Sequence, residues 1–278
     1  MTTATAIPSA VTDAPSAGVK TARLLRSEWT KLVTVRSTLW SLLLLVILTP
    51  GLSALLTWLN EHNWAKADPS QRANITDDPT SFILGTGFAF GQLTICVLGV
   101  LVMAGEYSTG SIRSSLLAVP KRTPMLAAKC AVFAALVFFF GELVAFPSFL
   151  LGAKILHNHV VVSLSDPGVL RAVIGGGLYL AVLGLFALAI GALVRHTAGA
   201  VTGVIAFVLV LAPLAQLLPG SLGKHVHAYL PSEAGHLIAQ AHRGDTDLLS
   251  PWQGFGVFCL WTAILLGLAA WLLNRRDA

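Results

Sequence analysis

The chain has 278 residues, of which 55% are hydrophobic and only 11% are charged, and its mean hydropathy is +0.76. Soluble domains carry about a quarter charged residues, so this composition excludes an ordinary soluble protein and indicates a membrane protein. A net charge of +5 would favour nucleic acid as a partner of a soluble chain. Here the basic residues flank apolar runs, which is typical of membrane orientation signals, so we expect no nucleic-acid partner.

Residues 1–19 consist mainly of Ala, Thr, Ser and Pro and contain one charge, which predicts a disordered cytoplasmic tail. The first apolar run starts near Leu39 and is about twenty residues long, so we expect it to remain as a membrane span and not to be a cleaved signal peptide. We therefore expect residues 20–278 to form a single transmembrane domain. The three cysteines lie inside apolar runs, where they act as small apolar side chains.

A helix needs roughly 20 mostly apolar residues to cross a bilayer, and it satisfies its own backbone hydrogen bonds there. Six segments meet this condition, which predicts an all-α polytopic protein with six transmembrane helices. The segments are Leu39 to Leu59, Phe82 to Ala104, Met125 to Leu151, Val169 to Val194, Ala198 to Leu218, and Trp252 to Leu273.

An even number of spans places both termini on one side, and the basic residues indicate which side. With cytoplasmic termini, the inner segments hold most of the basic residues, while the outer ones hold only Lys66, Arg72, Lys154, Arg171, Lys224 and Arg243. The positive-inside rule thus predicts that both termini lie in the cytoplasm. We expect a multi-pass protein of the plasma membrane. The first-to-second and fourth-to-fifth connections differ greatly in length, which argues against the inverted repeat of many secondary transporters.

Two cytoplasmic segments are predicted not to span. Leu25, Trp29 and Leu32 share one face of a basic helix before the first span, which is typical of a helix lying in the inner interface; the alternative is a simple extension of that span. The loop over residues 105–124 has Glu106 and Tyr107 at the membrane edge.

Gly110 interrupts the helix that enters this loop, and Thr109 or Ser111 can cap a new one. Ile112, Leu116 and Val119 then form an apolar stripe that Pro120 ends, and Arg113 faces outward. The alternative is a charged turn. An apolar stripe in the cytosol favours a protein partner or the headgroup layer.

Three stretches, "LLRSEWTKLVTVRSTLW", "AGEYSTGSIRSSLLAVPKRTPMLAAK" and "WLLNRRDA", together resemble the permease subunits of type-2 ABC exporters, in particular the six-span form frequent in actinomycetes. The resemblance covers the chain from about Lys20 onward. It implies a dimer of permease subunits, identical or different, on two separately encoded ATP-binding subunits that hold ATP and Mg.

By the same resemblance, the loop after the second span is a coupling helix against the ATPase. Its interface residues would be Glu106, Tyr107, Thr109, Gly110, Ile112, Arg113 and Leu116. The basic amphipathic segment would be the interfacial connecting helix, and residues 219–251 would supply short external helices. The chain has no GxxxxGK[ST] string to hold a nucleotide, so we expect it to have no cofactor and to be no enzyme by itself.

Outside these segments, Glu142 lies well inside the third span, where a charge is expensive. It is either a substrate or proton contact or a carboxyl that helps helices to pack. The external pairs His157 with His159 and His225 with His227 lack further ligands, so we expect no metal site. The glycine pairs at 87 and 91 and at 199 and 203 are expected to serve packing within the subunit.

Three functions remain open at this stage. The first is an ABC exporter permease with an unidentified drug-like, lipid or peptide-like substrate. The second is a proton-coupled secondary transporter that uses Glu142. The third is a membrane anchor or sensor that transports nothing.

Overall fold

The computed structural model describes residues 17–110, 122–244 and 247–275. Across these ranges the chain is helical and contains no strand, which confirms the all-α class. Five helices are long and apolar enough to cross a membrane, as expected of a multi-pass membrane protein. They are α2 (Arg36–His62), α4 (Pro79–Ser108), α6 (Arg122–Leu156), α7 (Val169–Val194) and α12 (Pro251–Arg275).

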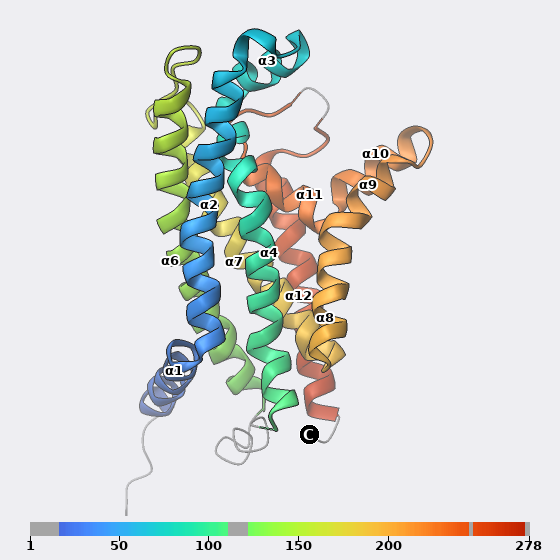
Figure 1. The fold of residues 1–278 in the computed structure, drawn as a ribbon. Helices are drawn as coiled ribbons and strands as arrows, with labels where there is room; N and C mark the ends of the chain where they lie inside the picture. Colours follow the sequence, from blue (N-terminus) through green and yellow to red (C-terminus); the bar gives the residue numbers. More distant parts are fainter. Residues whose placement is uncertain (1–16, 111–121, 245–246, 276–278) are drawn as a thin grey trace, which may run out of the picture.

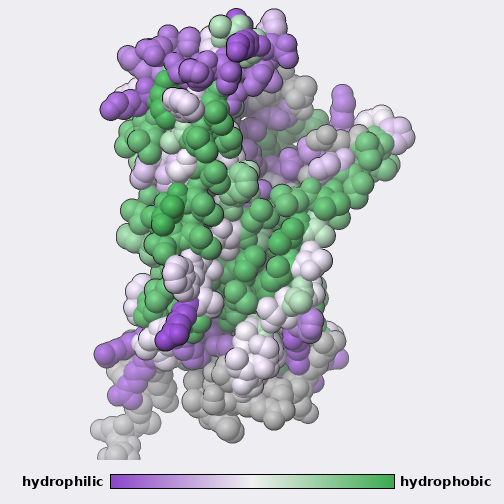
Figure 2. Space-filling model, in the orientation of Figure 1, coloured by the Kyte–Doolittle hydropathy of each residue, from purple (hydrophilic) through white to green (hydrophobic). Residues whose placement is uncertain are grey.

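These five helices run alongside one another (Figure 1). Helix α1 (Ala17–Thr34) lies at one end of the bundle, with the last turn of α4, the start of α6 and the last turn of α12; we name this the α1 end. Helix α3 (Pro69–Asp77) lies at the opposite end, named the α3 end. Apolar side chains cover the middle of the visible face, and hydrophilic ones gather at both ends (Figure 2). This distribution suits a protein surrounded by lipid.

The segment expected to be the fifth span is not one long helix. It consists of α8 (Thr197–Ile205), the π-helical turn η2 (Ala206–Val210) and α9 (Leu211–Gln216), which follow one another without a gap. Pro213 explains part of the break, because its nitrogen has no hydrogen to donate to the carbonyl of Leu209, four residues earlier. Composition alone had predicted an unbroken span from Ala198 to Leu218.

Short elements complete the described chain. Between α2 and α4 lie η1 (Trp64–Lys66) and α3; between α9 and α12 lie α10 (Gly220–Tyr229), α11 (Pro231–His236) and η3 (Leu237–Ala239). Helix α1 starts at Ala17, so the helical segment begins before Lys20, the boundary expected from the sequence.

Helix α7 is the most buried of the long helices and packs against α4, α6 and α12. Its limits match the expected span because a left-handed residue bounds it on each side: Gly168 has φ 84° and Arg195 has φ 57°. Only Arg195 and His196 join it to α8, so the connection is as tight as expected.

Small residues allow the helices to approach closely. A Cβ on Gly87 would overlap the carbonyl of Thr49 in α2, and one on Gly91 would lie 2.8 Å from the Thr49 hydroxyl. The expectation that this pair serves packing within the subunit is therefore confirmed. It is wrong for Gly203, because a Cβ there would meet nothing within 4 Å.

Candidate functional site

Four charged side chains from α1, α4 and α6 meet at the α1 end. The ammonium of Lys129 donates to Glu28 Oε2 at 2.6 Å and to Glu106 Oε1 at 2.7 Å. The ammonium of Lys31 lies 2.7 Å from Glu28 Oε1 and 3.5 Å from Glu106 Oε1. We name these four residues the charge cluster. It joins three helices whose residues are up to 101 positions apart.

The charge cluster is largely removed from solvent. The side chains of Glu28 and Lys129 are each 2% exposed and that of Glu106 is 13% exposed, while Lys31 is 39% exposed. Buried charges are tolerated only when they are paired and hydrogen-bonded. Two carboxylates face two ammonium groups here, so the charges balance.

Local sequence explains why these charges point inward. Glu28 lies three residues after Leu25 and four before Leu32, so it shares the apolar face of α1. Lys129 lies four residues after Met125 and four before Phe133, both buried. A charged residue in an apolar helical stripe is the sequence signal that marks this cluster, and our sequence interpretation missed it for both Glu28 and Lys129.

The surroundings shift the pKa values of the two residues that α1 contributes to the charge cluster, Glu28 and Lys31. Burial acts to raise the pKa of the Glu28 carboxyl, but the positive charge and hydrogen bond of Lys129 and the hydrogen bond of Lys31 outweigh burial, so the pKa lies below its ordinary 4.5. Burial acts to lower the pKa of Lys31. The hydrogen bond to Glu28 and the charge of Glu106 outweigh it, so that pKa lies above its ordinary 10.5.

These shifts predict a pH window. The Glu28 carboxylate contributes stability that is complete above about 4.5, the unfolded pKa, and is lost as pH falls through the lower folded value. The contribution of Lys31 is complete below about 10.5 and is lost as pH rises through its raised folded value. We expect the difference in melting temperature between wild type and Glu28→Gln in detergent to be constant near neutral pH and to shrink below about pH 4.5.

The control for this pH series is Asp68→Asn, because Asp68 is exposed at the α3 end and its side chain caps no helix. Its melting temperature should follow that of the wild type at every pH. A wild-type to Glu28→Gln difference that persists unchanged through the acidic range would contradict the assignment of Glu28 as an ionised partner of Lys129.

The structure places the other residues of the expected coupling interface as follows. The guanidinium of Arg195 lies 4.8 Å from the centroid of the Tyr107 ring, in cation–π geometry. Thr109 and Gly110 are exposed at the end of α4, and Gly110 has φ 70°. Ile112, Arg113 and Leu116 lie outside the described residues.

The three expected apolar residues of α1 have different environments. Leu32 is buried and Leu25 packs against the core, whereas Trp29 is 47% exposed. Trp29 borders an apolar groove between α1, α2 and α6 that Leu136 and Phe139 also line. The apolar face of α1 therefore rests partly on the bundle.

A cavity of about 380 Å³ adjoins the charge cluster. Lys31, Glu106 and Lys129 line it together with apolar residues of α1, the α1–α2 connection and α4: Leu32, Val35, Leu101 and Val102. Glu106 Oε2 is buried and has no hydrogen-bond partner in the described part of the chain. Glu106 thus contributes one oxygen to the cluster, and its second oxygen has no hydrogen-bond partner among the described residues.

Glu142 lies in the middle of α6 and faces α7. A Cβ on Gly177 would overlap Glu142 Oε1, so the carboxyl group occupies the space that this glycine leaves. Both carboxyl oxygens are buried, and neither has a hydrogen-bond partner within residues 17–110, 122–244 and 247–275. A polar group without a partner in this environment is expensive, which marks a functional candidate.

The histidine pairs do not form a metal centre among the described residues, where no group of three or more potential ligands occurs. His159 stacks on Trp64, with ring centroids 4.5 Å apart. His227 Nε2 lies 3.5 Å from Glu233 Oε2, and His225 contacts the carbonyl of Ser221.

Comparisons with known proteins give no match: no family model matches the sequence, and no curated protein matches it. The case for a function therefore rests on the residues of the chain itself, above all on the charge cluster and Glu142.

Proposed function

We propose that the chain is the membrane-spanning permease subunit of an ABC-type exporter, driven by ATP hydrolysis on a separate ATP-binding subunit. In this proposal it lies in the plasma membrane with both termini in the cytoplasm and pairs with a second permease subunit. The α1 end is then cytoplasmic, and α8, η2 and α9 together make the fifth of six crossings. Figure 1 supports that crossing, because these three elements lead from the α1 end towards the α3 end.

The observation that carries the proposal is the charge cluster. Its hydrogen bonds of 2.6 and 2.7 Å join α1, the last turns of α4 and the first turns of α6. The expected coupling helix lies in the loop between α4 and α6, so a partner that pushes on this loop acts on both helices. Because charge-assisted hydrogen bonds are strong, the cluster makes α1 move with them. A permease driven from outside the membrane needs such a connection.

A cross-linking experiment tests the proposal. Ser108 is exposed at the end of α4, and Ser165 is exposed in the connection between α6 and α7, at the α3 end. A photoreactive amino acid at position 108 is expected to cross-link to a co-expressed ABC ATP-binding subunit, whereas one at position 165 should not. Neither position belongs to the charge cluster, so folding is preserved.

Two further measurements accompany the cross-link. The wild-type chain should copurify with the ATP-binding subunit and change its rate of ATP hydrolysis, because in this proposal the ATPase moves the permease during each cycle. The proposal is wrong if the ATPase neither copurifies nor changes its rate, or if positions 108 and 165 cross-link equally.

A second candidate, a proton-coupled transporter, is favoured by one observation, the buried Glu142 carboxyl whose oxygens have no partner in the described chain. Flux in reconstituted vesicles separates the candidates. Transport that needs a proton gradient but no ATP, and that Glu142→Gln abolishes, would replace the exporter proposal. Vesicles without any flux would instead favour a membrane anchor or sensor.

A further inference from the structure

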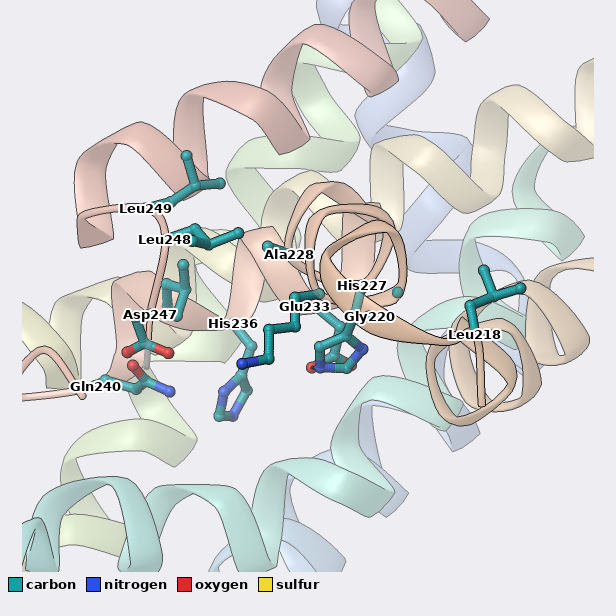
Figure 3. Close-up of a pocket in the computed structure, with 13 residues that line it drawn as sticks. Leu218, Gly220, His227, Ala228, Glu233, His236, Gln240, Asp247, Leu248 and Leu249 are labelled. Atoms are coloured by element: carbon teal, nitrogen blue, oxygen red, sulfur yellow. Dashed lines mark ion pairs between the residues drawn. The ribbon is translucent and has the colours of Figure 1, made fainter. Parts of the chain in front are cut away.

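A cavity of about 450 Å³ lies towards the α3 end, between α10, α11 and the segment that leads into α12. Figure 3 shows side chains from these three parts directed towards a common space, among them His227, Glu233, His236 and Asp247. Its volume falls in the range of sites for small molecules. It shares no residue with the charge cluster or with the cavity beside it.

Helix α10 covers this cavity and is amphipathic. Gly223, Lys224 and His227 line the cavity, whereas Leu222 and Val226 are exposed and do not line it. Figure 2 shows apolar side chains along the arm that α9 and α10 form, and hydrophilic ones in the hollow beside it. An amphipathic helix of this kind places its apolar side towards lipid, so the cavity opens close to the membrane surface.

The cavity brings opposite charges together without neutralising them. Among the described residues, the ammonium of Lys224 makes no hydrogen bond or ion pair. His227 Nε2 lies 3.5 Å from the Glu233 carboxylate, and His236 is a second basic neighbour of Glu233. One oxygen of Asp247 accepts the backbone N–H of Gly244 at 2.8 Å. The residues that line the cavity therefore include one ammonium and two carboxylates, while the guanidinium of Arg243, outside the lining, donates to the backbone carbonyl of Asp247 at 2.8 Å.

The deep side of the cavity is polar but uncharged. Burial lowers the pKa of His236 below its ordinary 6.5, although Glu233 and Asp78 act in the opposite direction, which favours the neutral ring. The ring stands edge-on to Tyr179, with centroids 6.0 Å apart. The Tyr179 hydroxyl donates to Gln92 at 2.9 Å, so hydrogen-bonding groups continue from the cavity into the bundle.

We propose that this cavity binds an amphipathic zwitterion, a molecule with an ammonium group, an anionic group and an apolar body. Glu233 and Asp247 would hold the ammonium group, and Lys224 would hold the anionic group. The apolar body would contact the leucine wall of the cavity, formed by Leu218, Leu237, Leu248 and Leu249.

The charged groups of the cavity favour a zwitterion over an apolar, a cationic or an anionic ligand. A purely apolar ligand would remove three charged groups from water without giving them partners, which is costly. An amine without an anionic group would leave Lys224 unpaired, and an anion without an amine would face two carboxylates. Both a phosphoethanolamine headgroup with an acyl chain and a short apolar peptide have the required chemistry.

A competition assay with the full chain in nanodiscs of phosphatidylglycerol, an anionic lipid without an amine, tests the proposal. The probe is lysophosphatidylethanolamine with a fluorophore at the end of its acyl chain. Its competitors are unlabelled lysophosphatidylethanolamine, the tripeptide Leu-Leu-Leu, dodecylamine and dodecyl phosphate. At least one zwitterion should compete about tenfold better than dodecylamine or dodecyl phosphate. A zwitterion makes one more charge-assisted hydrogen bond in the cavity than a ligand with a single charge.

The zwitterion that competes better identifies the source, a lipid headgroup or a peptide. Lys224→Gln and Glu233→Gln should each weaken probe binding about tenfold. Lys224→Gln should also remove the advantage of the zwitterions over dodecylamine. Lys66→Gln, which removes an exposed ammonium at the same end, is the matched control and should bind like the wild type.

Two results would overturn the proposal. One is equal competition by all four amphiphiles, which indicates partition into lipid. The other is probe binding that Lys224→Gln and Lys66→Gln leave equally unchanged. Lys224 is exposed, so its replacement should not impair folding, and the assay needs no ATP-binding subunit. Its outcome is therefore independent of the exporter proposal.

Discussion

Replacing Lys129 by Met is expected to lower the free energy of unfolding by about 3–5 kcal/mol, the cost of removing one partner from a buried ion pair. Lys129 is 2% exposed and lies within 2.7 Å of two carboxylates. Without it, Glu28 and Glu106 lie near each other with Lys31 as their remaining cationic neighbour in the charge cluster. Unfolding by SDS in mixed micelles measures the loss.

Two variants make this prediction specific. Lys154→Met removes an exposed lysine near the other end of α6 and should change stability by less than about 0.5 kcal/mol. The double variant Lys129→Met with Glu106→Gln keeps Glu28 paired with Lys31 and restores charge balance, so it should recover part of the loss. A single variant as stable as Lys154→Met would show that Lys129 does not hold α1 to the bundle.

The second large effect concerns Gly99, where α4 crosses α7. A Cβ at this position would overlap the carbonyl of Gly184 and lie 2.8 Å from Cβ of Ala187, so the two helices would have to separate. Overpacking of this kind costs about 1–3 kcal/mol, and more where backbone atoms cannot yield. We expect Gly99→Ala to destabilise the chain by at least this amount in the same SDS assay.

Gly85 provides the matched control, because it lies in the same helix and a Cβ there would meet nothing within 4 Å. Alanine favours the helix by up to about 1 kcal/mol relative to glycine, so Gly85→Ala should leave stability unchanged or raise it. Replacing glycine by alanine is thus expected to destabilise the chain at position 99 of α4 but not at position 85. Equal effects at both positions would contradict the close α4–α7 crossing.

The long helices could be predicted from the sequence because each depends on a local property, an apolar run of sufficient length. The helices extend several residues beyond most predicted spans: the first span was expected over Leu39 to Leu59, and α2 covers Arg36–His62. Hydropathy reports the part of a helix that suits lipid, whereas hydrogen bonding continues past it. The π-turn at Ala206–Val210 was not predicted, because the hydropathy of the segment is that of an unbroken span, and Pro213 alone does not determine where the extra residue is placed.

The candidate site was predicted less completely, since it depends on contacts between distant segments. Glu106 was predicted to belong to an interface with an ATPase, and the structure adds that it pairs with Lys129 and Lys31 inside the chain. That pairing required knowledge of how α1 docks on α6. Glu142 was predicted as a carboxyl for a pathway or for packing, and the structure adds that Gly177 makes room for it. The cavity under α10 combines residues that no single motif contains.

The π-turn between α8 and α9 has a geometric consequence. One residue corresponds to about 100° of rotation and 1.5 Å of rise in an α-helix. A π-turn holds one extra residue, so it changes the direction in which the following side chains point relative to those before it. The direction of α9 and α10 is therefore set in discrete steps by the number of residues in Ala206–Val210. Loss of one residue there would rotate α9, and the chain that leads from it into α10, by about 100° relative to α8. The position of α10 beside α11 therefore depends on the backbone register of this π-turn as well as on contacts such as that between His227 and Glu233.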